Sequence, residues 1–204
     1  MRSFLLAPLF LLTLAVGAFA DEEAEMIPLS DLSVWLNELK TAKGSFTQIN
    51  PDESISTGSI YIHRPGRIRF EYNAPDKALV MAGASTVAVF DGKSNQPPQQ
   101  YPLKKTPLSV ILARNVNLEQ DNMITAHFAD EVSTTVIAQD PERPEIGFIE
   151  LKFTSDPIEL RQWIITDEGG NATTVILGEM EFGLELNNNL FSIVYEMDKL
   201  GFSQ

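Results

Sequence analysis

The fold is decided by residues 45–91, which begin Ser45-Phe-Thr-Gln48, continue as Gly58-Ser-Ile-Tyr-Ile-His-Arg-Pro-Gly-Arg-Ile-Arg-Phe-Glu-Tyr72 and end at Phe90-Asp91. Short segments rich in β-branched and aromatic residues are separated here by Pro, Gly, Asn and Asp, which predicts an antiparallel meander. Within it, Ile68, Phe70 and Tyr72 fall on one face of a strand. The opposite face carries Arg67, Arg69 and Glu71. We therefore expect one face to meet apolar matter, either a core or a ligand, and the other to face water.

Strand signals return after residue 123 and continue the sheet. We expect strands at residues 124–128, 132–138, 146–153, 160–166 and 173–180, and a last one at 192–195. Turns such as Ser155-Asp-Pro157 separate them at hairpin spacing, so the pairing stays antiparallel. Roughly ten strands with few helical residues predict a mainly β (α+β) protein whose curved sheet forms a half-open, unclosed β-barrel.

Two helices are expected on this sheet. Leu32, Trp35, Leu36 and Leu39 form an apolar stripe after a possible N-cap at Ser30, and this pattern predicts a helix that ends near residues 43–44 and covers the sheet. Residues 94–100 lack periodicity and contain two prolines, which indicates a loop. A second, short helix follows at Pro107, with the apolar stripe Leu108, Ile111 and Leu112. Because it has few sequence-local ties, we expect it to act as a mobile lid.

The N-terminus is typical of an exported protein. Arg2 precedes an apolar run that ends in Ala18-Phe19-Ala20, which predicts a signal peptide at residues 1–20, cleaved after Ala20, and hence a periplasmic location. A flexible acidic leader is expected at 21–28 and a single domain at 29–204. The mature chain carries 14 basic and 28 acidic residues, a balance that disfavours nucleic acid and anionic membranes as partners. The absence of cysteine excludes thiolate chemistry, disulfides and an N-terminal lipid anchor.

An ordered set of motifs resembles the periplasmic outer-membrane lipoprotein carrier family, the LolA family. It consists of Gly44-x-Phe46-x-Gln48, Gly58, Arg64-Pro65-Gly66, Phe70-x-Tyr72-x-x-Pro75, Phe90-Asp91-Gly92, Tyr101-Pro102-Leu103 and the segment from Pro107 to Arg114. The resemblance covers residues 32–114 best and continues only as a strand pattern. Two positions depart from the family: Phe70 stands where Trp is frequent, and His63 where Lys is common. Neither change removes an apolar wall, although both alter the shape expected for the cavity.

The resemblance implies a half-barrel carrier that shields the acyl chains of lipoproteins and takes them from an inner-membrane ABC transporter to an outer-membrane acceptor. We expect it to act as a monomer and with no cofactor. It also implies that Arg64 hydrogen-bonds the lid backbone in the ligand-free state, as a latch. A guanidinium suits that role because its rigid fork can satisfy several carbonyls. The residues expected to line the acyl-chain cavity are Ile68, Phe70, Tyr72, Val87, Val89, Ile149, Leu151 and Phe153.

The sequence offers little that suggests catalysis. His63 and His127 lie singly in strand patterns, without the spacing of a metal site, and we expect structural or solvent-facing roles for both. The segment Gly83-Ala-Ser-Thr-Val87 lacks the second glycine of a nucleophile elbow. We therefore expect no catalytic residues, no metal and no enzymatic activity. Two alternatives to the carrier stay open, a lipid-sensing regulatory module of the same half-barrel type and, less consistent with these motifs, a periplasmic hydrolase.

Overall fold

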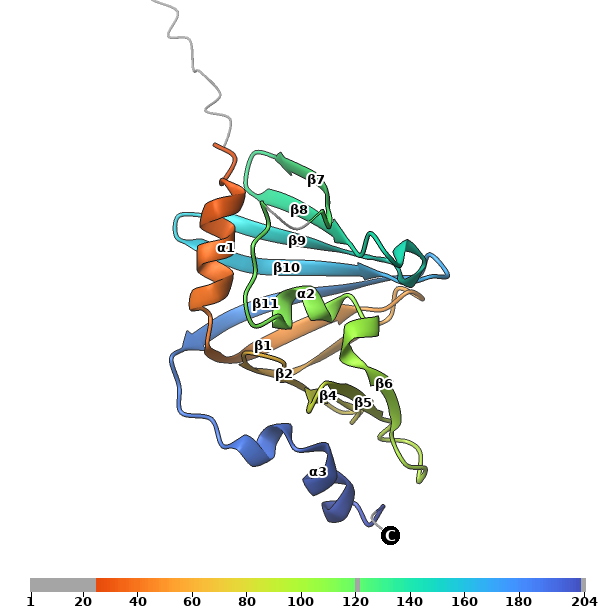
Figure 1. Cartoon of the computed structure of the whole chain (residues 1–204). Coiled ribbons are helices and arrows are strands. Elements are labelled where there is room, and N and C mark those ends of the chain that lie inside the picture. Colours follow the sequence, from red (N-terminus) through yellow and green to blue (C-terminus); the bar gives the residue numbers. More distant parts are fainter. Residues whose placement is uncertain (1–24, 120–121, 203–204) are drawn as a thin grey trace, which may run out of the picture.

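The computed structural model describes residues 25–119 and 122–202 and contains one sheet of 11 strands in the order β6-β5-β4-β3-β2-β1-β11-β10-β9-β8-β7. Every neighbouring pair is antiparallel. The strands are β1 (Thr41–Ile49), β2 (Ile55–His63), β3 (Ile68–Tyr72), β4 (Leu79–Gly83), β5 (Thr86–Phe90), β6 (Gln99–Pro102), β7 (Ile124–Ala129), β8 (Thr134–Gln139), β9 (Phe148–Ser155), β10 (Ile158–Thr166) and β11 (Ala172–Phe182). Since β6 and β7 lie at opposite edges of this curved sheet, the predicted unclosed half-barrel is confirmed (Figure 1).

The centre of the sheet is β1, which pairs with β2 on one side and β11 on the other and so joins the two halves of the chain. Its Phe46 lies opposite Gly58 of β2, where a Cβ atom would come within 2.7 Å of the Phe46 ring. The missing side chain leaves room for that ring, which packs edge-on against Phe70 at 5.2 Å and Tyr72 at 5.0 Å between centroids. Phe46, from the Gly44-x-Phe46-x-Gln48 motif, thus lies at the packing centre of the concave face.

Two helices cover the concave face of the sheet, α1 (Leu29–Glu38) and α2 (Leu108–Leu112) (Figure 1). The buried residues beneath them form one large cluster that includes Leu32 and Leu36 of α1, Ile111 of α2 and Trp163 of β10. A short 3-10 turn, η1 (Leu103–Lys105), precedes α2. Both predicted helices exist, and the core of the molecule lies between them and the sheet.

A third helix, α3 (Ile193–Lys199), packs on the convex face after the 3-10 turn η3 (Asn188–Phe191). The predicted last strand at 192–195 is therefore wrong. Ile193 joins a second apolar cluster made by Leu79, Met81, Ala88 and Phe90 of β4 and β5. The expectation that the polar face of β3 meets water is wrong for Arg69, which is only 5% exposed beneath this helix. The chain's own C-terminal segment covers it.

Several element boundaries also differ from expectation. Pro28, not Ser30, occupies the N-cap of α1, which ends at Glu38 because β1 begins at Thr41. The end of the predicted 94–100 loop is already strand β6.

The predicted signal peptide and the start of the acidic leader lie outside the described residues. At the end of that leader, Ile27 is buried, and its backbone N–H donates to Thr134 Oγ1 at 3.0 Å. The flexible leader expected at 21–28 therefore does not extend to this residue.

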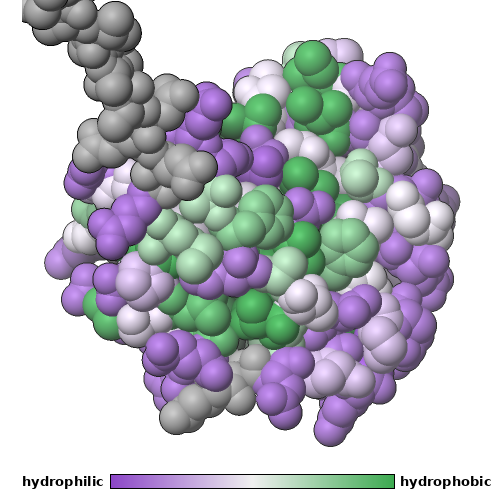
Figure 2. Space-filling view, turned by 90° about the horizontal axis from the view of Figure 1, so that it is seen from above, coloured by the Kyte–Doolittle hydropathy of each residue, from purple (hydrophilic) through white to green (hydrophobic). Residues whose placement is uncertain are grey.

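Some large apolar side chains remain at the surface. Seen from above, apolar patches interrupt the otherwise polar exterior (Figure 2). Phe128 of β7 and Phe182 of β11 are 46% and 47% exposed. Scattered exposed apolar residues are normal, and only a group that shares one hollow calls for an explanation. Within residues 25–119 and 122–202, none of the helices is long and apolar enough to cross a membrane.

Candidate functional site

The end of α2 is held by the turn between β2 and β3. Arg64 Nη2 donates a hydrogen bond to the Ala113 carbonyl at 2.6 Å, and Nη1 makes a longer contact of 3.5 Å to the Leu39 carbonyl. Two residues on, the Gly66 backbone N–H donates to the Leu112 carbonyl at 2.9 Å. The side chain of Arg64 thus bridges the carbonyls that follow both helices of the concave face.

Burial shapes the chemistry of this arginine. Arg64 is 5% exposed, and its burial lowers the pKa of the guanidinium below the ordinary value, although arginine stays charged in proteins. Its Nε is buried and has no hydrogen-bond partner among the described residues. Among the described residues, backbone carbonyls are the hydrogen-bond partners of the guanidinium, and its Nε nitrogen is left without one. Such an arrangement binds a helix end without the strength of a full ion pair.

The loop after α2 is tied to α1 rather than to its own neighbours in sequence. Asn37 Nδ2 donates to the Val116 carbonyl at 2.8 Å, and the Val116 N–H donates back to Asn37 Oδ1 at 2.9 Å. One turn earlier, Ser33 Oγ accepts from the Leu118 N–H at 2.9 Å. Sequence reasoning missed this pair, because Asn37 and Val116 lie 79 positions apart and neither belongs to a local pattern. The helix α1, this loop and α2 form one continuous cover.

The apolar stripe of the predicted lid faces inward. Leu108, Ile111 and Leu112 are all buried in the concave-face cluster. Of the predicted cavity residues, the following six are buried in the same cluster: Ile68, Phe70, Val87, Ile149, Leu151 and Phe153. These side chains are packed together under the helices in this structure, so their role as the lining of an open cavity stays a prediction.

The other two predicted cavity residues are less enclosed. Val89 of β5 is half-buried, and Tyr72 packs at the border of the cluster, with its hydroxyl donating to Gln48 Oε1 at 2.7 Å. Burial, with a smaller contribution from the charge of Asp76, raises the pKa of Tyr72 to about 12, although the bond to Gln48 opposes this. Tyr72 is thus a neutral polar residue at the rim of an apolar face.

Open space flanks the short helix α2 on two sides. A groove of about 510 Å³ lies between it and the η1 turn, with Leu103, Ser109 and Leu112 in its wall. A smaller one of about 200 Å³ lies toward Val116 and Met123. The helix has five residues, and its buried side chains pack on the sheet, so its movement as a lid stays a prediction.

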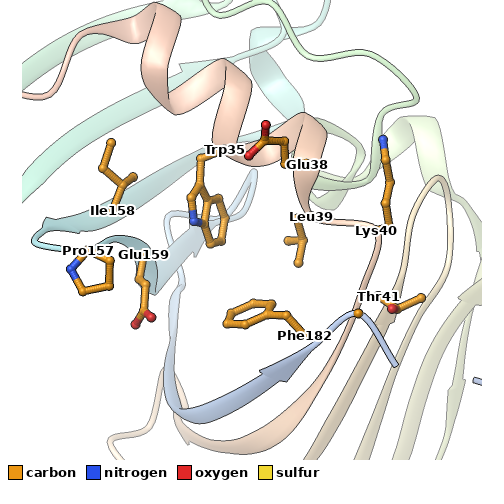
Figure 3. Close-up of a pocket in the computed structure, with 10 residues that line it drawn as sticks. Trp35, Glu38, Leu39, Lys40, Thr41, Pro157, Ile158, Glu159 and Phe182 are labelled. Carbon is orange, nitrogen blue, oxygen red and sulfur yellow. The ribbon is translucent and has the colours of Figure 1, made fainter. Parts of the chain in front are cut away.

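Another groove, of about 410 Å³, opens where α1 ends, beside the β9–β10 turn and the end of β11. Figure 3 shows Trp35, Leu39 and Phe182 around a common space, with Pro157 and Ile158 on its far side. Sequence reasoning placed Trp35 in the stripe of the first helix and passed over Phe182. Val175 and Leu177 lie in the concave-face core, so strict alternation along β11 would put Phe182 on the convex side. The register shift between β1 and β11 after Leu177 reverses this facing, which alternation in the sequence could not show.

The described residues hold no arrangement typical of catalysis. The His127 ring contacts the Ile27 carbonyl at 3.0 Å, and burial, helped by the charge of Arg67, lowers the pKa of His63. Ala84 and Ser85 both have positive φ and form the tight turn between β4 and β5. Over residues 25–119 and 122–202, no group of three His, Asp or Glu side chains could hold a metal ion.

These features define a class of protein: an open β half-barrel whose apolar concave face lies beneath a small helical cover. Residues 37–194 match the family model described as outer membrane lipoprotein carrier protein LolA. The chain belongs to this family, whose members are non-enzymatic carriers. It is 27% identical over 191 residues to the outer-membrane lipoprotein carrier protein of Methylococcus capsulatus, with 90% of each chain covered. It is 24% identical over 199 residues to that of Pseudomonas aeruginosa, covering 92% of this chain and 93% of the relative.

Among solved structures, the chain is similar to a LolA superfamily protein from Nitrosomonas europaea. The TM-score is 0.42 at 9% identity, with 81% of this chain and 98% of that chain covered. The fold is defined by the strand order of the sheet.

Proposed function

We propose that this protein is a periplasmic carrier that holds the acyl chains of lipoproteins against its concave face and moves them from the inner to the outer membrane. The observation that carries the proposal is the hydrogen bond from Arg64 to the Ala113 carbonyl, which holds a five-residue helix over a buried apolar face. The end of α2 is fastened to the sheet by the hydrogen bonds of Arg64 and Gly66, and a short helix fastened in this way is suited to opening for an apolar ligand.

The energetics give the proposal its content. Each methylene buried away from water contributes about 0.8 kcal/mol, so acyl chains cannot cross an aqueous gap unless a protein shields them. In the closed state, the side chains of the concave face and those of the cover shield one another. On loading, the acyl chains replace the cover as the partner of the concave face. The bound and empty states then differ little in free energy, and loading is reversible.

Several further parts of the proposal concern processing and partners. Residues 1–20 act as a signal peptide removed after Ala20, and residues 29–204 form one domain. An inner-membrane ABC transporter supplies the lipoprotein and an outer-membrane acceptor receives it. Arg64 is the latch of the empty state, and the packed apolar residues of the concave face become the cavity wall when α2 moves.

The test is mass spectrometry of the protein purified from its own periplasm. We expect a lipoprotein to co-purify at about one per carrier. A free lipid without protein cargo would instead favour the lipid-sensing module. Release of an ester or glycan product on incubation would favour a hydrolase. Finding the protein with its N-terminus uncut, or outside the periplasm, would contradict the proposed export.

A further inference from the structure

The groove at the end of α1 is a hollow made largely of apolar side chains. Its volume of about 410 Å³ lies in the range of small-molecule sites, roughly 300–1,000 Å³. The rings of Trp35 and Phe182 approach edge-to-face, with centroids 6.4 Å apart. Phe182 is nevertheless 47% exposed. Two aromatic side chains that share an open hollow leave apolar area that a ligand can bury.

The groove adjoins the concave-face core. Trp35 also packs edge-on against Phe153, at 5.7 Å between centroids, and Phe153 is fully buried. Leu39, on the opposite wall, belongs to the same core cluster. Trp35 and Leu39 therefore separate the groove from the residues proposed to line the acyl-chain cavity. The groove is open in this structure while Arg64 holds the end of α2. A ligand can therefore enter the groove before the hydrogen bond of Arg64 breaks.

The charges at the rim indicate what kind of chain fits. Two carboxylates, Glu38 and Glu159, and one ammonium group, Lys40, line the opening. Glu159 pairs with Arg161 at 3.0 Å, so positive charge is not in excess at the mouth. A free fatty acid would bring its own carboxylate to this rim and gain little favourable electrostatic energy there. An acyl chain joined through an ester or amide carries no charge at that point, so the rim charges do not weaken its binding.

We propose that this groove is a first-contact subsite for one ester- or amide-linked acyl chain, occupied while α2 is still latched. The inference deepens the proposed carrier function and rests on it. One chain enters between Trp35 and Phe182 before the cover opens. It then passes between Trp35 and Leu39 toward Phe153 once the hydrogen bond from Arg64 to the Ala113 carbonyl breaks. Loading is thus divided into a latch-independent and a latch-dependent step.

The experiment uses 1-monodecanoylglycerol, a neutral single-chain ester, added to the isotopically labelled protein below its micelle concentration. The chain has only two tryptophans, Trp35 and Trp163, so two indole N–H signals report separately on the groove and on the buried core. We expect the Trp35 signal to shift with saturation and the Trp163 signal to stay in place. Decanoate at neutral pH should bind more weakly than the ester.

Variants test which residues hold the ester. Phe182→Ser should weaken its affinity about fivefold to tenfold, since the ring supplies much of the apolar wall. The matched control is Phe128→Ser, which changes an equally exposed phenylalanine on β7 and should leave the affinity unchanged. Ile158→Ser provides a second groove variant should Phe182→Ser fold poorly. Arg64→Leu tests whether binding depends on the latch, because the ester should already bind at Trp35 in the wild type, where the latch is intact.

The outcomes separate this proposal from the carrier function. If Phe182→Ser and Ile158→Ser both bind the ester as tightly as wild type does, the proposed subsite is wrong, and the proposed carrier function is not affected. The same holds if the ester binds only to Arg64→Leu and shifts the Trp163 signal. If neither the ester nor a lipoprotein binds to any variant, both proposals are wrong.

Discussion

The two helices on opposite faces of the sheet, α2 and α3, are each held by an arginine of the same hairpin, and the two arginines use different partners. Arg64 reaches backbone carbonyls beside α2, whereas Arg69 pairs with Glu196 of α3 at 3.1 Å and with Glu71 at 2.7 Å. Glu196 also accepts from Lys199 at 3.0 Å. A charge that meets carboxylates is held more firmly than one that meets carbonyls. The comparison indicates that the Arg69–Glu196 ion pair, here called the convex fastening, holds α3 permanently, whereas the hydrogen bond from Arg64 can release α2 on the concave face.

The largest effect is expected at the convex fastening. Arg69→Leu leaves Glu196 buried with Lys199 as its remaining charged partner among the described residues, and breaking a buried pair costs about 3–5 kcal/mol. Urea denaturation should show a loss of this size in the free energy of unfolding.

Two further variants test whether the buried pair itself is responsible. Arg161→Leu, which removes an exposed pair with Glu159, serves as the control and should cost less than about 1 kcal/mol. The double variant Arg69→Leu/Glu196→Leu should regain part of the loss. If Arg69→Leu and Arg161→Leu lower the free energy of unfolding equally, the buried pair holds α3 no more firmly than an exposed pair would, and the contrast with Arg64 is lost.

The second expectation concerns hydrogen exchange at the backbone amides of the helices α2 and α3. Those of Leu108, Ile111 and Leu112 should exchange with solvent at least about a hundredfold faster than those of the central strand β2, a difference of about 2.7 kcal/mol in opening free energy. Ligand loading should change these rates, while those of α3 should not respond. Hydrogen exchange followed by mass spectrometry measures both helices in one sample. Equal protection of α2 and β2, loaded and empty, would reject a lid.

The alternation of residues within strands could be predicted from the sequence, because a half-buried strand repeats every two residues. Ile68 and Phe70 accordingly lie in the concave-face core. The position of Arg64 followed from the family resemblance, and the structure places its guanidinium at the end of the predicted lid helix. Its action as a latch stays a prediction, as does the cavity.

The C-terminal helix was not predictable in the same way. Residues 192–195 contain Ile193, Val194 and Tyr195, which favour a strand locally. The helix forms because Ser192 caps it, accepting from the Tyr195 N–H at 3.2 Å, and because Ile193 and Glu196 become buried against the sheet. The partner of Glu196 lies 127 positions away, and no local pattern reveals it. The same distance hid the true environment of Arg69.

The third expectation concerns transfer rather than stability. Arg64→Leu removes hydrogen bonds to a charged group, worth about 1.5–3 kcal/mol, that exist only while α2 is closed. The empty state loses this stabilisation, so apparent cargo affinity should rise about tenfold and release to an acceptor should slow. Transfer from donor membranes and then to an acceptor separates the two steps. Arg114→Leu is the control, an exposed arginine next to Ala113. Wild-type transfer by Arg64→Leu would mean that packing alone closes the lid.

The smallest effect is expected from pH on the convex fastening. Burial by itself would raise the pKa of the Glu196 carboxyl, but the hydrogen bond from Lys199 and the charge of Arg69 outweigh it and hold this pKa below its ordinary value of 4.5. Because the pKa is lower in the folded than in the unfolded chain, the contribution to stability is complete above pH 4.5 and is lost as pH falls through the folded value. Unfolding free energy should therefore lose this contribution only below pH 4.5. Glu196→Gln should be less stable at pH 7 and approach wild type in acid. If the difference between the two proteins is the same at pH 7 and pH 3, the carboxylate charge does not hold α3, and apolar packing of Ile193 does.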